Sequence, residues 1–136
     1  MGLFSKTNNE SIGADTELLS KCISPDYRAG WLKRHVPKNG PAIRSALSSG
    51  ESPIAICYGD QPSGCAVITT RRLFFVNGGK LGESFELSRI RSVQIVDSLR
   101  KFKNKDLRID IDGRPYALVL EFETVHHAEV ARTLLS

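Results

Sequence analysis

The sequence predicts a mainly β fold with helices at both ends. Seven antiparallel strands form a barrel or sandwich, a C-terminal helix caps it, and two or three short helices precede it. From Ser52 onward apolar residues recur at every second position, whereas before it they recur at every third or fourth. Turns rich in Gly, Asn and Asp separate the alternating segments at roughly ten-residue intervals. The final segment returns to helical spacing.

The first third of the chain predicts a tail followed by a helical extension. Residues 1–14 are polar and show no period, which indicates a flexible tail. Residues 15–49 carry apolar residues at helical spacing, and Asp15 is a good N-cap for the first helix. We expect Pro37 to end the second helix and Gly50 to end the third.

Residues 50–136 are expected to form the β domain. The apolar run Leu73–Val76 has no polar face, which is typical of a central strand. Asn77-Gly78-Gly79-Lys80 has the residues that a type I′ hairpin turn needs, and Asp112-Gly113 is a second tight-turn pair. The seven strands are expected near residues 54–58, 65–69, 73–76, 83–87, 93–97, 107–112 and 116–122, with Tyr116, Leu118, Leu120 and Phe122 as the inward row of the last. Thr124 is expected to cap the final helix, whose apolar side is Ala128, Ala131, Leu134 and Leu135.

Composition indicates an ordinary folded protein. Of the 136 residues, 40% are apolar and 25% charged, and the formal charge of +4 is well below the basic excess of a dedicated nucleic-acid binder. The first residues lack the apolar run of about 7–15 residues that marks a signal peptide, so we expect a cytoplasmic location. The three cysteines, Cys22, Cys57 and Cys65, are odd in number and form no C-x-x-C pair, which indicates small apolar residues rather than a disulfide or zinc framework.

Three short strings stand out in the β region: LSSGE at 47–51, VITTRRLFFV at 67–76 and FELSRIRSV at 85–93, followed by the closing helix. These strings resemble those of bacterial pleckstrin-homology-like domains of the YokE-like kind. The resemblance covers about residues 47–135 and implies a pleckstrin-homology-like barrel or sandwich. It also implies a binding or scaffolding module, while the fold by itself specifies no ligand. Residues 15–46 lie outside the resemblance.

The sequence offers no catalytic, metal or cofactor site. His126 and His127 are neighbours on a predicted helix and point in different directions, and His35 lies far away in the chain. Asp110 and Asp112 share a strand face, which a solvated sheet surface explains. No glycine-rich phosphate loop leads into a helix. We therefore expect a protein that is not an enzyme.

The connection between the fifth and sixth strands is the most distinctive charged feature. An exposed aromatic among cations suits an anionic lipid surface, where each cation contributes on the order of 1 kcal/mol. A solvated hairpin that aids solubility is the alternative. Pleckstrin-homology domains that hold phosphoinositides usually place cations in the turn between the first two strands, and here that turn carries Asp60 instead. The candidate ligand or membrane residues are Lys80, Arg100, Lys101, Phe102, Lys103 and Lys105.

Tyr27, Trp31 and Leu32 form a second candidate site. Their spacing predicts an apolar helix face, which either binds a partner or docks the extension onto the barrel. Unpaired sheet edges and the groove beside the C-terminal helix are further adhesive surfaces. The arginine pair Arg71 and Arg72 is interpreted as structural ion-pair partners.

The leading functional hypothesis is a non-catalytic adaptor that recognises a protein, with self-association included, through a sheet edge or that groove. The alternative is peripheral binding to anionic phospholipid at the inner face of the membrane through the basic connection. Nucleic acid ranks third, because Phe102 is the only aromatic among the clustered cations.

Overall fold

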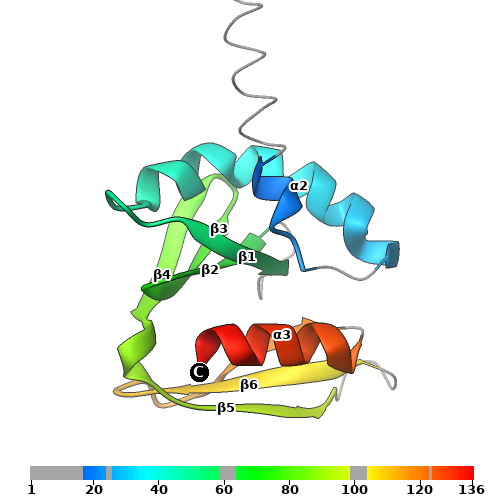
Figure 1. The fold of residues 1–136 in the computed structure, drawn as a ribbon, viewed down its shortest axis with the longest axis vertical. Helices are drawn as coiled ribbons and strands as arrows, with labels where there is room; N and C mark the ends of the chain where they lie inside the picture. Colours follow the sequence, from blue (N-terminus) through cyan, green and yellow to red (C-terminus); the bar gives the residue numbers. More distant parts are fainter. Residues whose placement is uncertain (1–16, 24–25, 59–63, 99–103, 123) are drawn as a thin grey trace, which may run out of the picture.

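The fold of the chain is a layered sandwich, as seen in a computed structural model. The structure describes residues 17–23, 26–58, 64–98, 104–122 and 124–136, and of residues 26–34 only the backbone. Figure 1 shows the helix α2 (Asp26–Ala46) across the top of a first sheet. The helix α3 (Val125–Leu135) lies on a second sheet, on the side that faces the first (Figure 1).

Within the ranges that the structure describes, seven antiparallel strands form two sheets, as the alternation predicts. The first sheet has the order β1-β2-β3-β4 and the second the order β5-β6-β7, so each strand pairs with its neighbours in sequence. The strands are β1 (Pro53–Tyr58), β2 (Gly64–Thr69), β3 (Arg72–Asn77), β4 (Lys80–Glu86), β5 (Ile90–Asp97), β6 (Lys105–Ile111) and β7 (Leu118–Phe122), and the 3-10 turn η1 (Leu87–Arg89) joins the sheets.

The predicted turns form where glycine permits a positive φ. Gly78 and Gly79 have φ of 59° and 78°, as the tight β3–β4 hairpin requires, and Gly113 has φ of 81° in the β6–β7 turn. Gly50, with φ of 80°, lies in the turn between α2 and β1. Thr124 caps α3 as predicted, because its side chain accepts a hydrogen bond from the backbone N–H of His127.

The main core lies between the two sheets and α3. Alternate residues of β1, β2, β3, β6 and β7 are buried in it, β4 contributes Phe85, and the helix contributes Ala128, Ala131 and Leu135. In β6 the predicted inward residues Leu107, Ile109 and Ile111 are buried, whereas Arg108 is exposed. The alternation that the sequence shows is therefore the physical basis of this core.

A second core covers the outer face of the first sheet. Val36 and Ile43 of α2 are fully buried against Val67 and Phe74 of the central strands. This explains why β2 and β3 are apolar on both faces. Among the described side chains, those that dock the extension on the sheet are Leu18 and residues of the second half of α2.

The separate helices predicted for residues 24–50 are wrong, because one continuous helix, α2, spans Pro37 and Pro41. Each proline removes a helical hydrogen bond, at a cost of about 3 kcal/mol in a helix interior. The buried positions of α2, among them Val36 and Ile43, recur at helical spacing, while Pro41 is exposed. Burial of that apolar face on the sheet offsets the missing hydrogen bonds.

Two further expectations about the β domain need correction. In the described part of the chain no ladder joins the two sheets, so they form an open sandwich and not a closed barrel. Tyr116 was expected to point inward, yet it is 79% exposed and lies before β7 begins at Leu118. The Asp112-Gly113 turn continues into an irregular connection, and alternation in β7 starts only after it.

Candidate functional site

The edges of the two sheets differ in what covers them. On β1, the N–H of Ile23 donates to the carbonyl of Ile56 at 2.8 Å, and the N–H of Ile56 donates to the carbonyl of Lys21 at 2.9 Å. The chain itself therefore occupies the middle of that edge. On β4 every side chain except Phe85 is exposed, and Leu81, at 51%, is the single large apolar side chain among them. The inward side chains of β7 are already buried, and this strand contacts β1.

The β5 edge is the remaining one, and its backbone geometry suits an added strand. Among the described residues, β5 pairs only with β6. The N–H of Ser98 donates to the carbonyl of Asn104 at 3.1 Å, which marks this pair as hydrogen-bonded. Hydrogen-bonded pairs alternate along an antiparallel ladder, so Val93, Ile95 and Asp97 direct their backbone N–H and C=O groups away from β6.

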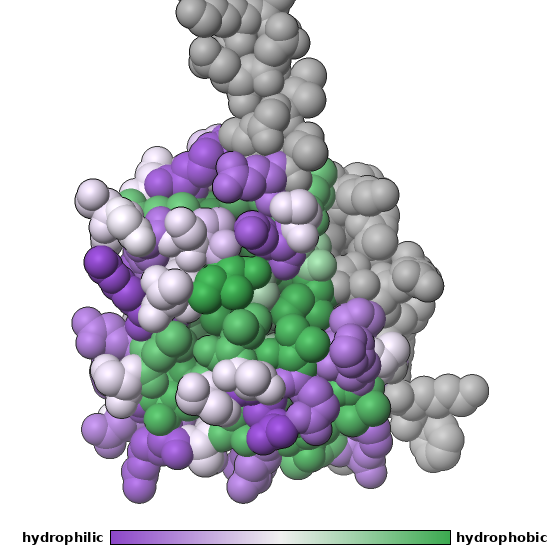
Figure 2. Space-filling view, in the orientation of Figure 1, coloured by the Kyte–Doolittle hydropathy of each residue, from purple (hydrophilic) through white to green (hydrophobic). Residues whose placement is uncertain are grey.

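The same strand carries apolar side chains that the molecule covers only partly. Val93 and Ile95 lie opposite Ile109 and Leu107, which are fully buried. At the edge, Val93 and Ile95 are only half-buried, and so is Leu134 of α3, which packs on this sheet. Figure 2 shows apolar surface across the middle of one face, between the first sheet and α3, with polar groups around it.

Opposite charges lie near the two ends of this strand. Arg91 is exposed near the start of β5, and Asp97 ends it with 83% of its side chain exposed. The ammonium group of Lys105, the first residue of β6, pairs with Oδ1 of Asp97. This hydrogen bond and the positive charge lower the pKa of Asp97. In the part of the chain that the structure describes, the β5 edge therefore combines backbone groups directed away from β6, a half-covered apolar centre and charged ends.

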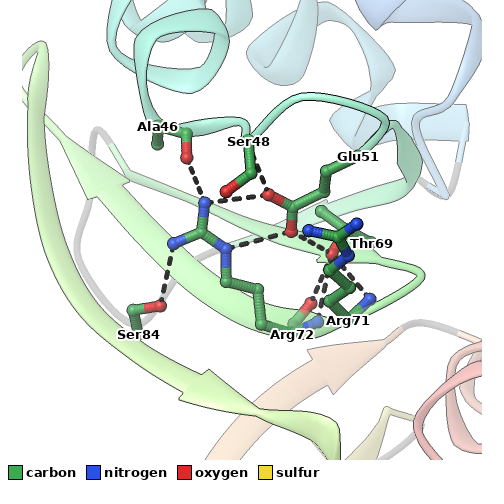
Figure 3. Close-up of polar contacts among 7 residues, drawn as sticks. All are labelled: Ala46, Ser48, Glu51, Thr69, Arg71, Arg72 and Ser84. Carbon is green, nitrogen blue, oxygen red and sulfur yellow. Dashed lines mark hydrogen bonds and ion pairs between the residues drawn. The ribbon is translucent and has the colours of Figure 1, made fainter.

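A buried ion pair holds the end of α2 to the first sheet (Figure 3). The guanidinium of Arg72 donates to both carboxylate oxygens of Glu51 at 3.0 Å and to the carbonyl of Ala46. The hydroxyl of Thr69 donates to Glu51 at 2.6 Å, and the N–H of Ser48 donates to it at 2.9 Å. Hydrogen bonds from Arg72, Ser48 and Thr69 outweigh burial and lower the pKa of Glu51 from 4.5 to about 2.

This network confirms Arg72 as a structural ion-pair partner. The guanidinium also lies 4.8 Å from the centre of the Phe74 ring. For Arg71 the structure gives an exposed side chain and a backbone N–H that donates to the Thr69 hydroxyl at 3.1 Å. Sequence analysis missed Glu51. Its only signal is a lone carboxylate between a turn glycine and the first strand.

Comparison with known proteins identifies the fold. No family model matches the chain, and no curated protein matches it either. Among solved structures, the chain is similar to a pleckstrin homology domain from Shewanella amazonensis SB2B, with a TM-score of 0.51 and 19% sequence identity. The likeness covers 68% of this chain and 88% of that one.

The chain has a pleckstrin-homology-like fold. This confirms the resemblance predicted from the strings in the β region, at the level of the fold. At this identity the likeness describes the architecture only, and the ligand has to be argued from this chain's own surface.

The predicted membrane-binding residues of this pleckstrin-homology-like fold lie in different layers or outside the described residues. Arg100, Lys101, Phe102 and Lys103 are outside them. Lys80 is exposed in the β3–β4 turn, where the side-chain amide oxygen of Asn39 in α2 accepts from the N–H of Gly79 at 2.9 Å. Lys105 belongs to the second sheet. Among the described residues no helix is long and apolar enough to cross a bilayer.

Tyr27, Trp31 and Leu32 lie in the first half of α2, and their side chains are outside the described set. Among the side chains of α2 that the structure describes, Val36 and Ile43 are buried against the first sheet. Whether the three residues bind a partner therefore stays a prediction.

The groups weighed for catalysis and metal binding are separated or engaged in structural contacts. The rings of His126 and His127 are 5.6 Å apart and tilted, and His127 contacts the Thr124 hydroxyl. Burial raises the pKa of Cys57 and Cys65 to about 12 and that of Cys22 to about 11, so these thiols are poor nucleophiles. Within the described ranges, no group of three His, Cys, Asp or Glu side chains is placed to hold a metal ion.

Proposed function

We propose that this chain is a non-catalytic binding module that recognises a protein by adding an extended strand to the β5 edge, beside α3. The observation that carries the proposal is the half-buried row of Val93 and Ile95 on a strand that pairs on one side. Main-chain hydrogen bonds supply affinity in this mode of binding, and the pockets for alternate side chains supply specificity.

Two physical arguments favour this edge. An added strand would bond to the backbone groups of Val93, Ile95 and Asp97, which already point outward. Its inward side chains would cover apolar surface that the edge leaves half exposed. Natural sheets commonly protect such an edge with charge or a covering element. Here the odd-numbered residues of β5 have an apolar centre, Val93 and Ile95, and the charges are confined to the ends of the strand.

The test compares two lysine variants on opposite faces of β5. Ile95→Lys places a charge in the apolar row, whereas Val96→Lys places it on the far face of the same strand, where Val96 is 39% exposed. The immobilised full chain and both variants are incubated with lysate from cells that produce the protein. We expect one defined protein to be retained by the wild type and by Val96→Lys and lost from Ile95→Lys.

Thermal unfolding of each variant, followed by circular dichroism, confirms that the fold survives. Equal retention of the captured protein by Ile95→Lys would contradict the β5 edge. Co-sedimentation tests the lipid alternative with phosphatidylglycerol and phosphatidylcholine vesicles. Binding to the anionic vesicles alone, lost when Arg100, Lys101, Lys103 and Lys105 are changed to Glu, would favour the membrane hypothesis instead.

A further inference from the structure

The row of odd-numbered residues on β5 is complementary to the same row of a second copy that runs in the opposite direction. Along the strand this row contains Arg91, Val93, Ile95 and Asp97. Its two ends carry opposite charges, and its two central residues are aliphatic and β-branched. Two copies placed antiparallel therefore bring each positive end to a negative end.

The register follows from the backbone. Only odd-numbered residues of this segment direct their N–H and C=O groups to the free edge, so odd residues must face odd residues across the new pairing. A twofold axis beside Gln94 places Arg91 opposite the partner's Asp97 and Val93 opposite the partner's Ile95. Each contact then occurs twice, as a twofold interface requires.

We propose that the strand added to the β5 edge is β5 of a second copy of this chain, in this register. The two three-stranded sheets become one sheet of six strands. This inference rests on the proposed function, since it names the occupant of the same edge. Its central pairs are Val93 with the partner's Ile95, and its outer pairs are Arg91 with the partner's Asp97.

The charged groups at the ends are free to make these contacts. Asp97 uses Oδ1 for Lys105, which leaves Oδ2 on a side chain that is 83% exposed. Arg91 is exposed, and the described residues give its side chain no ion pair. The β5–β6 register shifts between Ile90 and Ser92, so Arg91 is the extra residue of a bulge and has no partner residue of its own in β6.

The other accessible edge, β4, has one large exposed apolar side chain, Leu81, and no pair of aliphatic residues at its centre. β4 also carries opposite charges at its ends, Lys80 and Glu86. Between them on that row lie Gly82 and Ser84, which offer no aliphatic pair to bury. Cross-strand pairs of β-branched residues stabilise a sheet, and glycine weakens it. Self-pairing is therefore favoured at β5.

Charge-swap variants test the register. Arg91→Asp places Asp opposite Asp twice in a homodimer, and Asp97→Arg places Arg opposite Arg twice. We expect each variant to raise the dimer dissociation constant about tenfold or more, since like charges directly opposite each other destabilise a sheet pair. An equimolar mixture of the two variants restores both opposite-charge pairs, as does the double variant. Both should dimerise like the wild type.

The measurement is sedimentation velocity of the full chain from micromolar to near-millimolar concentration. Arg108→Asp is the matched control, because it makes the same charge change at an exposed position on the far face of the sheet. We expect it to dimerise like the wild type. Circular dichroism confirms that every variant is folded.

Three outcomes would overturn the inference: a monomeric wild type, a dimer indifferent to both single swaps, or swaps that weaken it without recovery in the mixture. The proposed function is judged separately. If the wild type is monomeric and captures another protein that Ile95→Lys does not retain, the second copy is refuted as the occupant and the β5 edge is kept as the binding site. If the wild type is monomeric and Ile95→Lys still retains the captured protein, both proposals are refuted.

Discussion

At the scale of single residues, the contact between Glu51 and Arg72 places a charged pair where one partner is almost fully buried. The Glu51 side chain is 1% exposed, so its charge has lost almost all contact with water. Such a charge is tolerated only when hydrogen bonds replace its hydration, and here Arg72, Thr69 and Ser48 supply them. Arginine suits this place because its planar group bonds both carboxylate oxygens at once.

The pKa of Glu51 predicts a specific dependence of stability on pH. The folded-state pKa is about 2 and the ordinary value is 4.5, so the unfolded chain binds the proton more tightly. The stabilisation is therefore complete above pH 4.5 and is lost as pH falls through about 2. It amounts to about 3 kcal/mol at most.

Glu51→Gln should lower the free energy of unfolding by about 2–3 kcal/mol at pH 7. The difference from the wild type should shrink steadily between pH 4.5 and pH 2. Urea unfolding of both proteins across this range measures it. A difference that stayed constant with pH would show that the loss comes from packing and not from the charge.

At the scale of elements, the strands were predictable and the helix α2 was not. A strand in this fold can be predicted from its own short stretch of sequence. Alternate side chains such as Leu107 and Ile109 are buried in the core whichever strand lies next to them. Proline is also a local signal, but its cost of about 3 kcal/mol is small beside the burial of a whole helix face. The helix therefore continues through Pro37 because of a sheet that lies later in the chain.

We expect the packing of Val36 and Ile43 to hold α2 on the first sheet. Ile43 is fully buried against the first sheet, so Ile43→Ala should cost about 2–4 kcal/mol of unfolding free energy through lost burial and a cavity. Lys38→Ala, at an exposed position of the same helix, should change it by less than about 0.5 kcal/mol. Urea unfolding measures both. Equal effects of the two variants would mean that α2 does not pack on the sheet in solution.

At the scale of the whole molecule, the candidate site depends on which sheet edges the other segments of the chain cover and which they leave exposed. The sequence predicts β5 as a strand and sheet edges as adhesive surfaces. It does not say which edge stays open, because residues 21–23 cover part of β1 through hydrogen bonds between distant segments. The half-exposed state of Val93 and Ile95 is likewise a property of the assembled sheet and α3. Glu51 was missed for the same reason.

The two-core arrangement also decides whether the predicted boundary at residue 50 separates independent units. A chain of residues 50–136 lacks Val36 and Ile43, so the outer face of the first sheet, with Val67 and Phe74, would meet water. It also lacks the Ala46 carbonyl, which accepts from Arg72. Exposed apolar patches of this kind lead to aggregation or to a loosely packed state.

We therefore expect the 50–136 fragment to bind the dye 8-anilinonaphthalene-1-sulfonate and to lose near-ultraviolet circular dichroism, whereas a 15–136 fragment unfolds like the full chain. Because α2 covers the sheet from outside, its removal leaves the inner residues of β6 and β7 and the face under α3 in place. Strand content should thus persist in the far-ultraviolet spectrum while fixed packing is lost. A 50–136 fragment that unfolds as cooperatively as the full chain would mean that the outer layer contributes no stability and that the domain does begin at residue 50.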